Sequence, residues 1–135
     1  LLDGEYKIFE EFSIVGIPDT LGDNDSRYAD LLSIFERLQS YKVAVVHRPI
    51  QFDSFLDISK YDVDLVLCGH THGGVVRIPF FGAFLSPDEG FFPKYSKGVY
   101  HKNDTTMVVS GGLGNTFLPL RINNFPEIVV LEINL

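Results

Sequence analysis

The chain has 135 residues, of which 45% are hydrophobic, and it carries a formal net charge of −7. This length and composition suit one domain with a packed core, and the acidic charge makes nucleic acid a poor partner. The charge does not exclude a phosphate ester held by a metal ion, because the ion supplies local positive charge. No run of 18 apolar residues is present, so no transmembrane helix is visible, and the one cysteine, Cys68, cannot form a disulfide within the chain.

Strands and helices alternate in the first half of the chain. Short apolar runs bounded by glycine or proline predict strands, and apolar residues at spacings of three and four predict helices. Strands that are apolar throughout are typical of a parallel α/β sheet. The predicted order is an edge strand within residues 1–10, a strand at 12–17, a loop at 21–27, a helix at about 27–40, a strand at 43–46, a short helix at 51–59 and a strand at 63–68.

Each predicted helix has an apolar face that should pack on the sheet. The inward residues are Leu31, Ile34, Phe35 and Leu38 in the first helix, and Phe52, Phe55, Leu56 and Ile58 in the second.

The second half of the chain has a different character. Prolines and glycines between residues 73 and 98 predict a long irregular segment, and loops of this length are uncommon unless they are functional. A hairpin is predicted from 98–101 and 105–110, and a last strand from 127–133. The irregular segment is rich in phenylalanine, for which packing inside the domain is favoured over covering a site or contacting an acyl chain: Phe80, Phe81, Phe84, Phe91 and Phe92.

Two histidines follow the strand that ends at Cys68, in the stretch Gly69-His70-Thr71-His72-Gly73-Gly74. On an extended backbone, residues two apart point to the same side, so both imidazoles should face one site at the carboxyl end of the strand. Histidines in this arrangement can ligate a metal ion or can be hydrogen-bonded loop residues, and this stretch alone favours neither reading.

The same stretch resembles the last signature of the calcineurin-like metallophosphoesterases, and His47-Arg48-Pro49 resembles the lone-histidine motif that precedes it in that family. Residues 91–98 and 112–127 resemble the bacterial branch of predicted phosphohydrolases, which includes lipid A pathway pyrophosphatases. The family's opening motifs, Asp-x-His, Gly-Asp-x-x-Asp and Gly-Asn-His, are absent in proper form. The resemblance therefore implies that residues 1–135 are the C-terminal half of a calcineurin-like phosphoesterase domain. The implied fold is α/β, half of a four-layer αββα sandwich, with parallel strand–helix–strand units followed by a β-rich tail.

The resemblance implies two divalent or trivalent metal ions, Mn, Fe or Zn, in the intact protein. It assigns His47 and His70 to one ion and His72 to the other, and it places no catalytic residue with certainty in this half. The residues themselves support the first pairing, since neighbouring parallel strands lie about 5 Å apart, so that two imidazoles at their ends can share one cation. The implied reaction is hydrolysis of a phosphate monoester, a phosphate diester or a lipid-linked pyrophosphate by a metal-bridging hydroxide.

Other polar residues have structural readings as well as functional ones. Arg48 and Arg121 could bind substrate phosphate, although arginines are more often solvated or paired. Asp19 lies where the branch often has an aspartate, and a role in stabilising a turn is at least as favoured. His101 is expected on the surface, and Cys68 is expected to be a buried packing residue.

Three functions remain in competition. The first is a binuclear metal phosphoesterase of which this chain is one half, inactive alone. The second is a non-catalytic fold remnant that acts as a binding or structural module, and the third is a mononuclear zinc hydrolase built on the three histidines. The expected partners are a phosphate-ester substrate, which could be a lipid or lie at a membrane, and either the missing half or a second copy, because the sheet should have an unpaired edge near 43–46 or 12–17. Localisation stays open, with a cytoplasmic or membrane-associated bacterial protein favoured.

Overall fold

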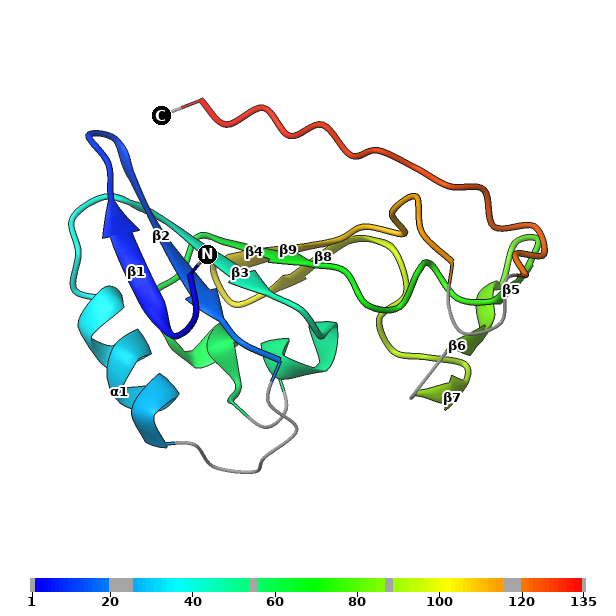
Figure 1. Ribbon diagram of the computed structural model, residues 1–135, viewed down its shortest axis with the longest axis horizontal. Coiled ribbons are helices and arrows are strands. Elements are labelled where there is room, and N and C mark those ends of the chain that lie inside the picture. Colours follow the sequence, from blue (N-terminus) through cyan, green and yellow to red (C-terminus); the bar gives the residue numbers. More distant parts are fainter. Residues whose placement is uncertain (1, 20–25, 54–55, 87–88, 116–119, 135) are drawn as a thin grey trace.

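The computed structural model describes the chain except for residues 1, 20–25, 54–55, 87–88, 116–119 and 135 (Figure 1). It contains a six-stranded sheet in the order β1-β2-β3-β4-β9-β8 and a separate three-stranded sheet in the order β5-β6-β7. The elements are β1 (Glu5–Ile8), β2 (Phe12–Ile17), α1 (Ser26–Phe35), β3 (Tyr41–Val46), the 3-10 turns η1 (Pro49–Phe52) and η2 (Ile58–Lys60), β4 (Leu65–Cys68), β5 (Val76–Ile78), β6 (Gly82–Ser86), β7 (Gly90–Phe91), β8 (Gly98–Lys102) and β9 (Thr105–Val109).

The centre of the six-stranded sheet is parallel, which confirms the α/β class. β2 pairs with β3, β3 with β4, and β4 with β9, all in parallel, while β1 and β8 add antiparallel edges. The predicted strands at 12–17, 43–46 and 63–68 and the hairpin are therefore confirmed. The expected free edge at 43–46 or 12–17 is wrong, because β1 covers the outer side of β2 and β3 is paired on both sides.

One face of this sheet is covered by α1 and the two 3-10 turns (Figure 1). The helix ends at Phe35 instead of near residue 40, and Leu32 and Phe35 are fully buried, whereas Ile34 is 54% exposed. Inward packing of Ile34 was therefore a wrong prediction, because 3.6 residues per turn place it about 100° around the helix from Phe35. Leu31 and Leu38 pack partly buried against the core as expected. Most of the predicted loop at 21–27 lies outside the described residues.

The short helix predicted at 51–59 is replaced by η1 and η2. Asp57, directly before η2, has a left-handed backbone (φ 47°), which is incompatible with a continuous right-handed helix. Phe52 and Ile58 are nevertheless fully buried, and Leu56 packs against the core. Phe55 lies outside the described residues.

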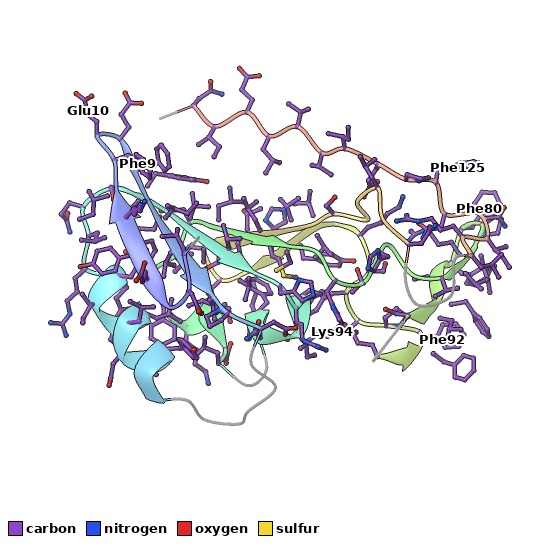
Figure 2. The ribbon with its side chains drawn as sticks, in the orientation of Figure 1. Phe9, Glu10, Phe80, Phe92, Lys94 and Phe125 are labelled. Carbon is purple, nitrogen blue, oxygen red and sulfur yellow. The ribbon has the colours of Figure 1, made fainter. Side chains whose placement is uncertain are left out.

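The segment after residue 73 is more regular than its composition suggests, because β5, β6 and β7 form an antiparallel sheet. Its phenylalanines do not pack inside the domain as predicted, since Phe80 is fully exposed and Phe81, Phe91 and Phe92 are more than half exposed. Only Phe84 is partly covered, by edge contacts with Phe91 and Phe92. Figure 2 shows Phe80 and Phe92 at the end of the molecule formed by the small sheet.

The strand predicted at 127–133 is extended but joins no ladder among the described residues. Side-chain exposure alternates along it: Ile128 and Val130 are 77% and 87% exposed, whereas Val129 and Leu131 are 41% and 42% exposed. Figure 1 shows this tail (red) running the length of the molecule apart from the strands of the main sheet. The last strand predicted at 127–133 is thus not formed among the described residues, since no described strand lies beside the tail to accept its hydrogen bonds. No helix in the described ranges is long and apolar enough to cross a membrane.

Candidate metal centre

The site begins where two neighbouring strands end. His47 follows β3 and Gly69 follows β4, and the amide of Gly69 donates a hydrogen bond to the His47 carbonyl oxygen at 3.2 Å. This bond continues the parallel ladder past the strand ends and brings His70 beside His47. His70 Nδ1 lies 2.9 Å from His47 Nε2, and the two rings meet edge-on with centroids 4.7 Å apart. The predicted proximity of these two imidazoles is therefore observed.

The spacing of these two nitrogens is compatible with a shared ion. Two ligands that each lie about 2.0–2.1 Å from a cation, at an angle of about 90–110°, are about 2.8–3.4 Å apart. The same separation also suits a hydrogen bond between the rings when one nitrogen bears the proton. Burial lowers the pKa of His47, and the neighbouring His70 lowers it further. The neutral ring that results is the form with a lone pair to donate.

His70 and His72 do not face one side through an extended backbone, as the period-two argument predicted. Both have left-handed backbones, with φ of 66° and 51°. For residues other than glycine this conformation is uncommon and persists only where surrounding contacts hold it. The chain therefore turns sharply after Gly69, so that His70 is aimed at His47 and His72 at the loop after β9.

The ring of His72 has a defined partner. Its Nδ1 lies 3.1 Å from the carbonyl oxygen of Gly114. Because a carbonyl oxygen can only accept, Nδ1 must carry the proton, and in the neutral ring Nε2 then keeps its lone pair. Metal-ligating histidines almost always donate their other N–H to a carbonyl or carboxylate in this way. In the neutral His72 ring, Nε2 is thus the nitrogen that could bind a metal ion.

The described residues do not form a metal site by themselves. Among them, no three His, Cys, Asp or Glu side chains converge closely enough to hold an ion. The chemistry of His47, His70 and His72 fits metal ligation, but further donors would have to come from elsewhere in the protein.

Arg48 and Asp19 form an ion pair beside the histidines. Arg48 Nε lies 2.5 Å from Asp19 Oδ1 and Nη2 lies 3.3 Å from Oδ2, while Nη1 lies 3.3 Å from His70 Nε2. Asp19 Oδ2 is 4.0 Å from His47 Nε2. The hydrogen bond from Arg48 holds the pKa of the Asp19 carboxyl below its usual range. Asp19 is therefore an ionised group at the site and not simply a turn residue, and Arg48 is a paired arginine.

The second candidate arginine contacts the loop that also holds the His72 ring. Arg121 Nη2 donates to the carbonyl oxygens of Gly111, Gly112 and Gly114, the first two at 2.9 and 3.3 Å. Its observed partners are thus backbone carbonyls of the loop after β9. A contact with substrate phosphate stays a prediction.

The sequence reasoning missed Asn124, which is 2% exposed. Its side-chain amide donates to the carbonyl oxygens of His72, at 2.8 Å, and Gly74. No periodicity marks this residue, and an Asn-Asn pair before Phe-Pro reads as an ordinary turn. Arg121, Asn123 and Glu127 are polar neighbours of it, so nothing in the local sequence distinguishes Asn124.

The two remaining predictions for single residues are confirmed. His101 is exposed on the hairpin, where its Nδ1 lies 3.1 Å from Thr106 Oγ1. Cys68 is 8% exposed, and burial raises the pKa of its thiol to about 12. A thiol with this pKa is protonated at neutral pH, which suits a packing residue and not a metal ligand.

The chain is similar to several bacterial proteins. It is 35% identical over 123 residues to the uncharacterized metallophosphoesterase YkuE of Bacillus subtilis, a match that covers 91% of this chain and 41% of YkuE. It is 37% identical over 70 residues to the phosphodiesterase YaeI of Escherichia coli, covering 52% of this chain and 25% of YaeI. It is also 25% identical over 122 residues to the uncharacterized metallophosphoesterase YkoQ of B. subtilis, covering 90% of this chain and 43% of YkoQ. No family model and no solved structure matches the chain. The chain spans less than half the length of each of these relatives.

Proposed function

Because the chain is homologous to bacterial metallophosphoesterases, we propose that it is part of a metal-dependent phosphoesterase that binds two metal ions, Mn, Fe or Zn, between these residues and the rest of the protein. The observation that carries the proposal is the 2.9 Å approach of His47 Nε2 to His70 Nδ1 at the ends of adjacent parallel strands. The substrate class is a phosphate mono- or diester or a lipid-linked pyrophosphate, and the name of the relative YaeI favours the diester.

Each histidine has a distinct part in this proposal. His47 and His70 hold one ion, and His72 holds the other through Nε2. When bound, a pair of such ions lowers the pKa of water and neutralises charge on phosphoryl oxygens. Asp19 keeps the Arg48 guanidinium at the edge of the site, and a guanidinium is well suited to bind a phosphate oxygen there. Arg121 contacts the carbonyl oxygens of the loop after β9, and substrate binding by this residue stays a separate prediction.

The fold of this chain suggests the part of the protein that would supply the further metal ligands. We propose that this chain is the C-terminal half of a four-layer αββα sandwich whose second sheet includes the 127–133 tail. The extended backbone of this tail, which joins no ladder among the described residues, is that of a strand whose neighbouring strand is absent. The main sheet also has a second apolar face, around Val43, Leu65 and Val108, opposite the face covered by α1. Both features, together with the length of the relatives, support a second layer supplied by the rest of the protein.

The test is metal content and hydrolysis in the full-length protein. Bis-p-nitrophenyl phosphate reports diester hydrolysis and p-nitrophenyl phosphate reports monoester hydrolysis. His47→Ala and His70→Gly should each lower the metal content and reduce turnover by orders of magnitude, while His101→Ala, at an exposed histidine, should change neither. Wild-type metal content and turnover in both site variants would refute the ligand assignment, whereas a wild-type protein without metal or turnover would favour a non-catalytic fold remnant. The isolated 135 residues should hydrolyse neither compound, because three neutral imidazoles cannot offset the repulsion between two divalent cations.

A further inference from the structure

The loop after β9 is held by side chains from the segment that follows it. Arg121 Nη2 donates to three of the loop's carbonyl oxygens, those of Gly111, Gly112 and Gly114. Glu127 Oε1 accepts the amide proton of Gly111 at 2.8 Å. A loop with three glycines in four positions has little conformational preference of its own, so these contacts determine where its carbonyl oxygens lie.

One of these carbonyl oxygens has two donors. Gly114 oxygen accepts from Arg121 Nη2 and lies 3.1 Å from His72 Nδ1. The Gly114 carbonyl oxygen thus links the Arg121 guanidinium to the His72 imidazole. A neutral imidazole can carry its proton on either nitrogen, and the hydrogen bond made by one nitrogen determines which tautomer is present.

We propose that Arg121 is a positioning residue for His72. By fixing the Gly114 carbonyl oxygen, it keeps the His72 proton on Nδ1 and the lone pair on Nε2. The inference rests on the proposed function only where it makes His72 a metal ligand. The link from Arg121 through Gly114 to the His72 tautomer stands on the hydrogen bonds alone.

The buried donors of the Arg121 guanidinium argue against a role in packing alone. Its Nε and Nη1 are buried and have no hydrogen-bond partner among the residues that the structure describes. Burying unsatisfied donors costs free energy, and an aliphatic side chain would fill the same space without that cost. The function of the guanidinium here therefore lies in the carbonyl contacts that it makes.

Asn124 has the complementary task of holding the backbone of His72. Its amide donates to the His72 and Gly74 carbonyl oxygens on either side of Gly73, whose Cβ, if present, would lie 2.6 Å from Asn124 Oδ1. Asn124 thus supports the left-handed turn, while Arg121 sets the proton position on the ring. The two residues should be separable by experiment.

The experiment compares Arg121→Met, Arg121→Lys and the wild type in the full-length protein. Methionine keeps much of the apolar stem and removes every donor, whereas lysine keeps a charged donor that can still reach a carbonyl oxygen. Histidine ring ¹⁵N shifts are recorded on metal-free protein near pH 8, above the usual histidine pKa of about 6.5. His101 is the internal reference, since its Nδ1 faces Thr106 and not this loop.

The wild type should show the Nδ1–H tautomer at His72, and Arg121→Met should show a mixture or the Nε2–H tautomer. Lysine should restore most of the wild-type pattern, and His101 should be unchanged in all three proteins. Zn²⁺ affinity should fall about 10- to 100-fold in Arg121→Met, as is typical when a partner of a metal ligand is removed. A folded Arg121→Met protein that keeps the pure Nδ1–H tautomer overturns the proposal. The proposal is also overturned if the His72 signal shifts as far in Arg121→Lys as it does in Arg121→Met.

The two proposals fail differently. A tautomer change without any loss of Zn²⁺ affinity would leave Arg121 as the positioning residue and remove His72 from the metal site. If Arg121 instead contacts substrate, its variants should raise KM while the tautomer stays fixed, which would refute the positioning role.

Discussion

The 2.9 Å separation between His47 and His70 leads to a quantitative prediction about metal stoichiometry. Four-ligand structural zinc sites bind with about 10–16 kcal/mol, so one ligand is worth about 2.5–4 kcal/mol, or about 10²–10³-fold in affinity. If both imidazoles ligate one ion, removing either should lower the affinity for that ion by this factor. Removing both should release the same ion and no other.

The variants are His47→Ala, His70→Gly and the double substitution, made in the full-length protein. Glycine is used at residue 70 because φ is 66° there, and alanine would add strain unrelated to the ligand. Metal content is measured by elemental analysis after dialysis against a free-metal concentration between the wild-type and weakened dissociation constants. His101→Ala, at the exposed histidine of the hairpin, is the matched control.

Each single variant and the double variant should lose the same one ion per molecule, and the control should lose none. The effects of the two substitutions on metal content would then not add, as expected for two residues that bind the same ion. A double variant that loses two ions when each single variant loses one would show that the histidines serve different ions. Unchanged content in all the variants would refute metal ligation by this pair altogether.

Three further predictions concern stability, each measured by urea unfolding of the full-length protein. Burial raises the pKa of Asp57, but hydrogen bonds from two lysines and a serine outweigh it and lower the pKa from 3.8 to about 2. Asp57→Asn should therefore cost up to about 2 kcal/mol at pH 7, and the difference from wild type should shrink as pH falls from about 4 to 2; a constant difference would contradict this. Gly74→Ala should cost about 1–3 kcal/mol, because φ is +87° and the new Cβ would lie 2.8 Å from an alanine Cβ of β6, whereas Gly69→Ala, with nothing within 4 Å, should cost less than about 0.5 kcal/mol. Phe35→Ala should cost about 3–5 kcal/mol, and the same change at the half-exposed Ile34 should cost under about 1 kcal/mol; equal costs would refute the observed helix orientation.

The sequence predicted those parts of the fold that depend on local pattern. Short apolar runs ending in histidine were enough to place β3 beside β4, since buried parallel strands leave few other arrangements. The proximity of His47 and His70 followed from that pairing. The left-handed backbones of His70 and His72 could not be predicted, because histidine rarely adopts this conformation and only the surrounding contacts select it here.

Long-range pairing explains the other differences. Asp19 and Arg48 are separated by 29 residues, so no spacing rule connects them. The strands of the small sheet have two to five residues, too few to show a period of two against a background of glycine and proline. The 127–133 tail has the composition of a strand, but its pairing depends on a neighbour that the described residues do not supply.

The buried thiol at the end of β4 offers a way to observe the dynamics of the site without touching a ligand. Cys68 is two residues from His70, is the one cysteine of these 135 residues, and has a thiol pKa of about 12. A thiol reagent can react only when the strand end opens and the thiol gains its ordinary acidity. The labelling rate of Cys68 therefore reports the free energy of local opening at the carboxyl end of β4. Bound metal should slow this labelling in proportion to how tightly it ties β3 and β4 together.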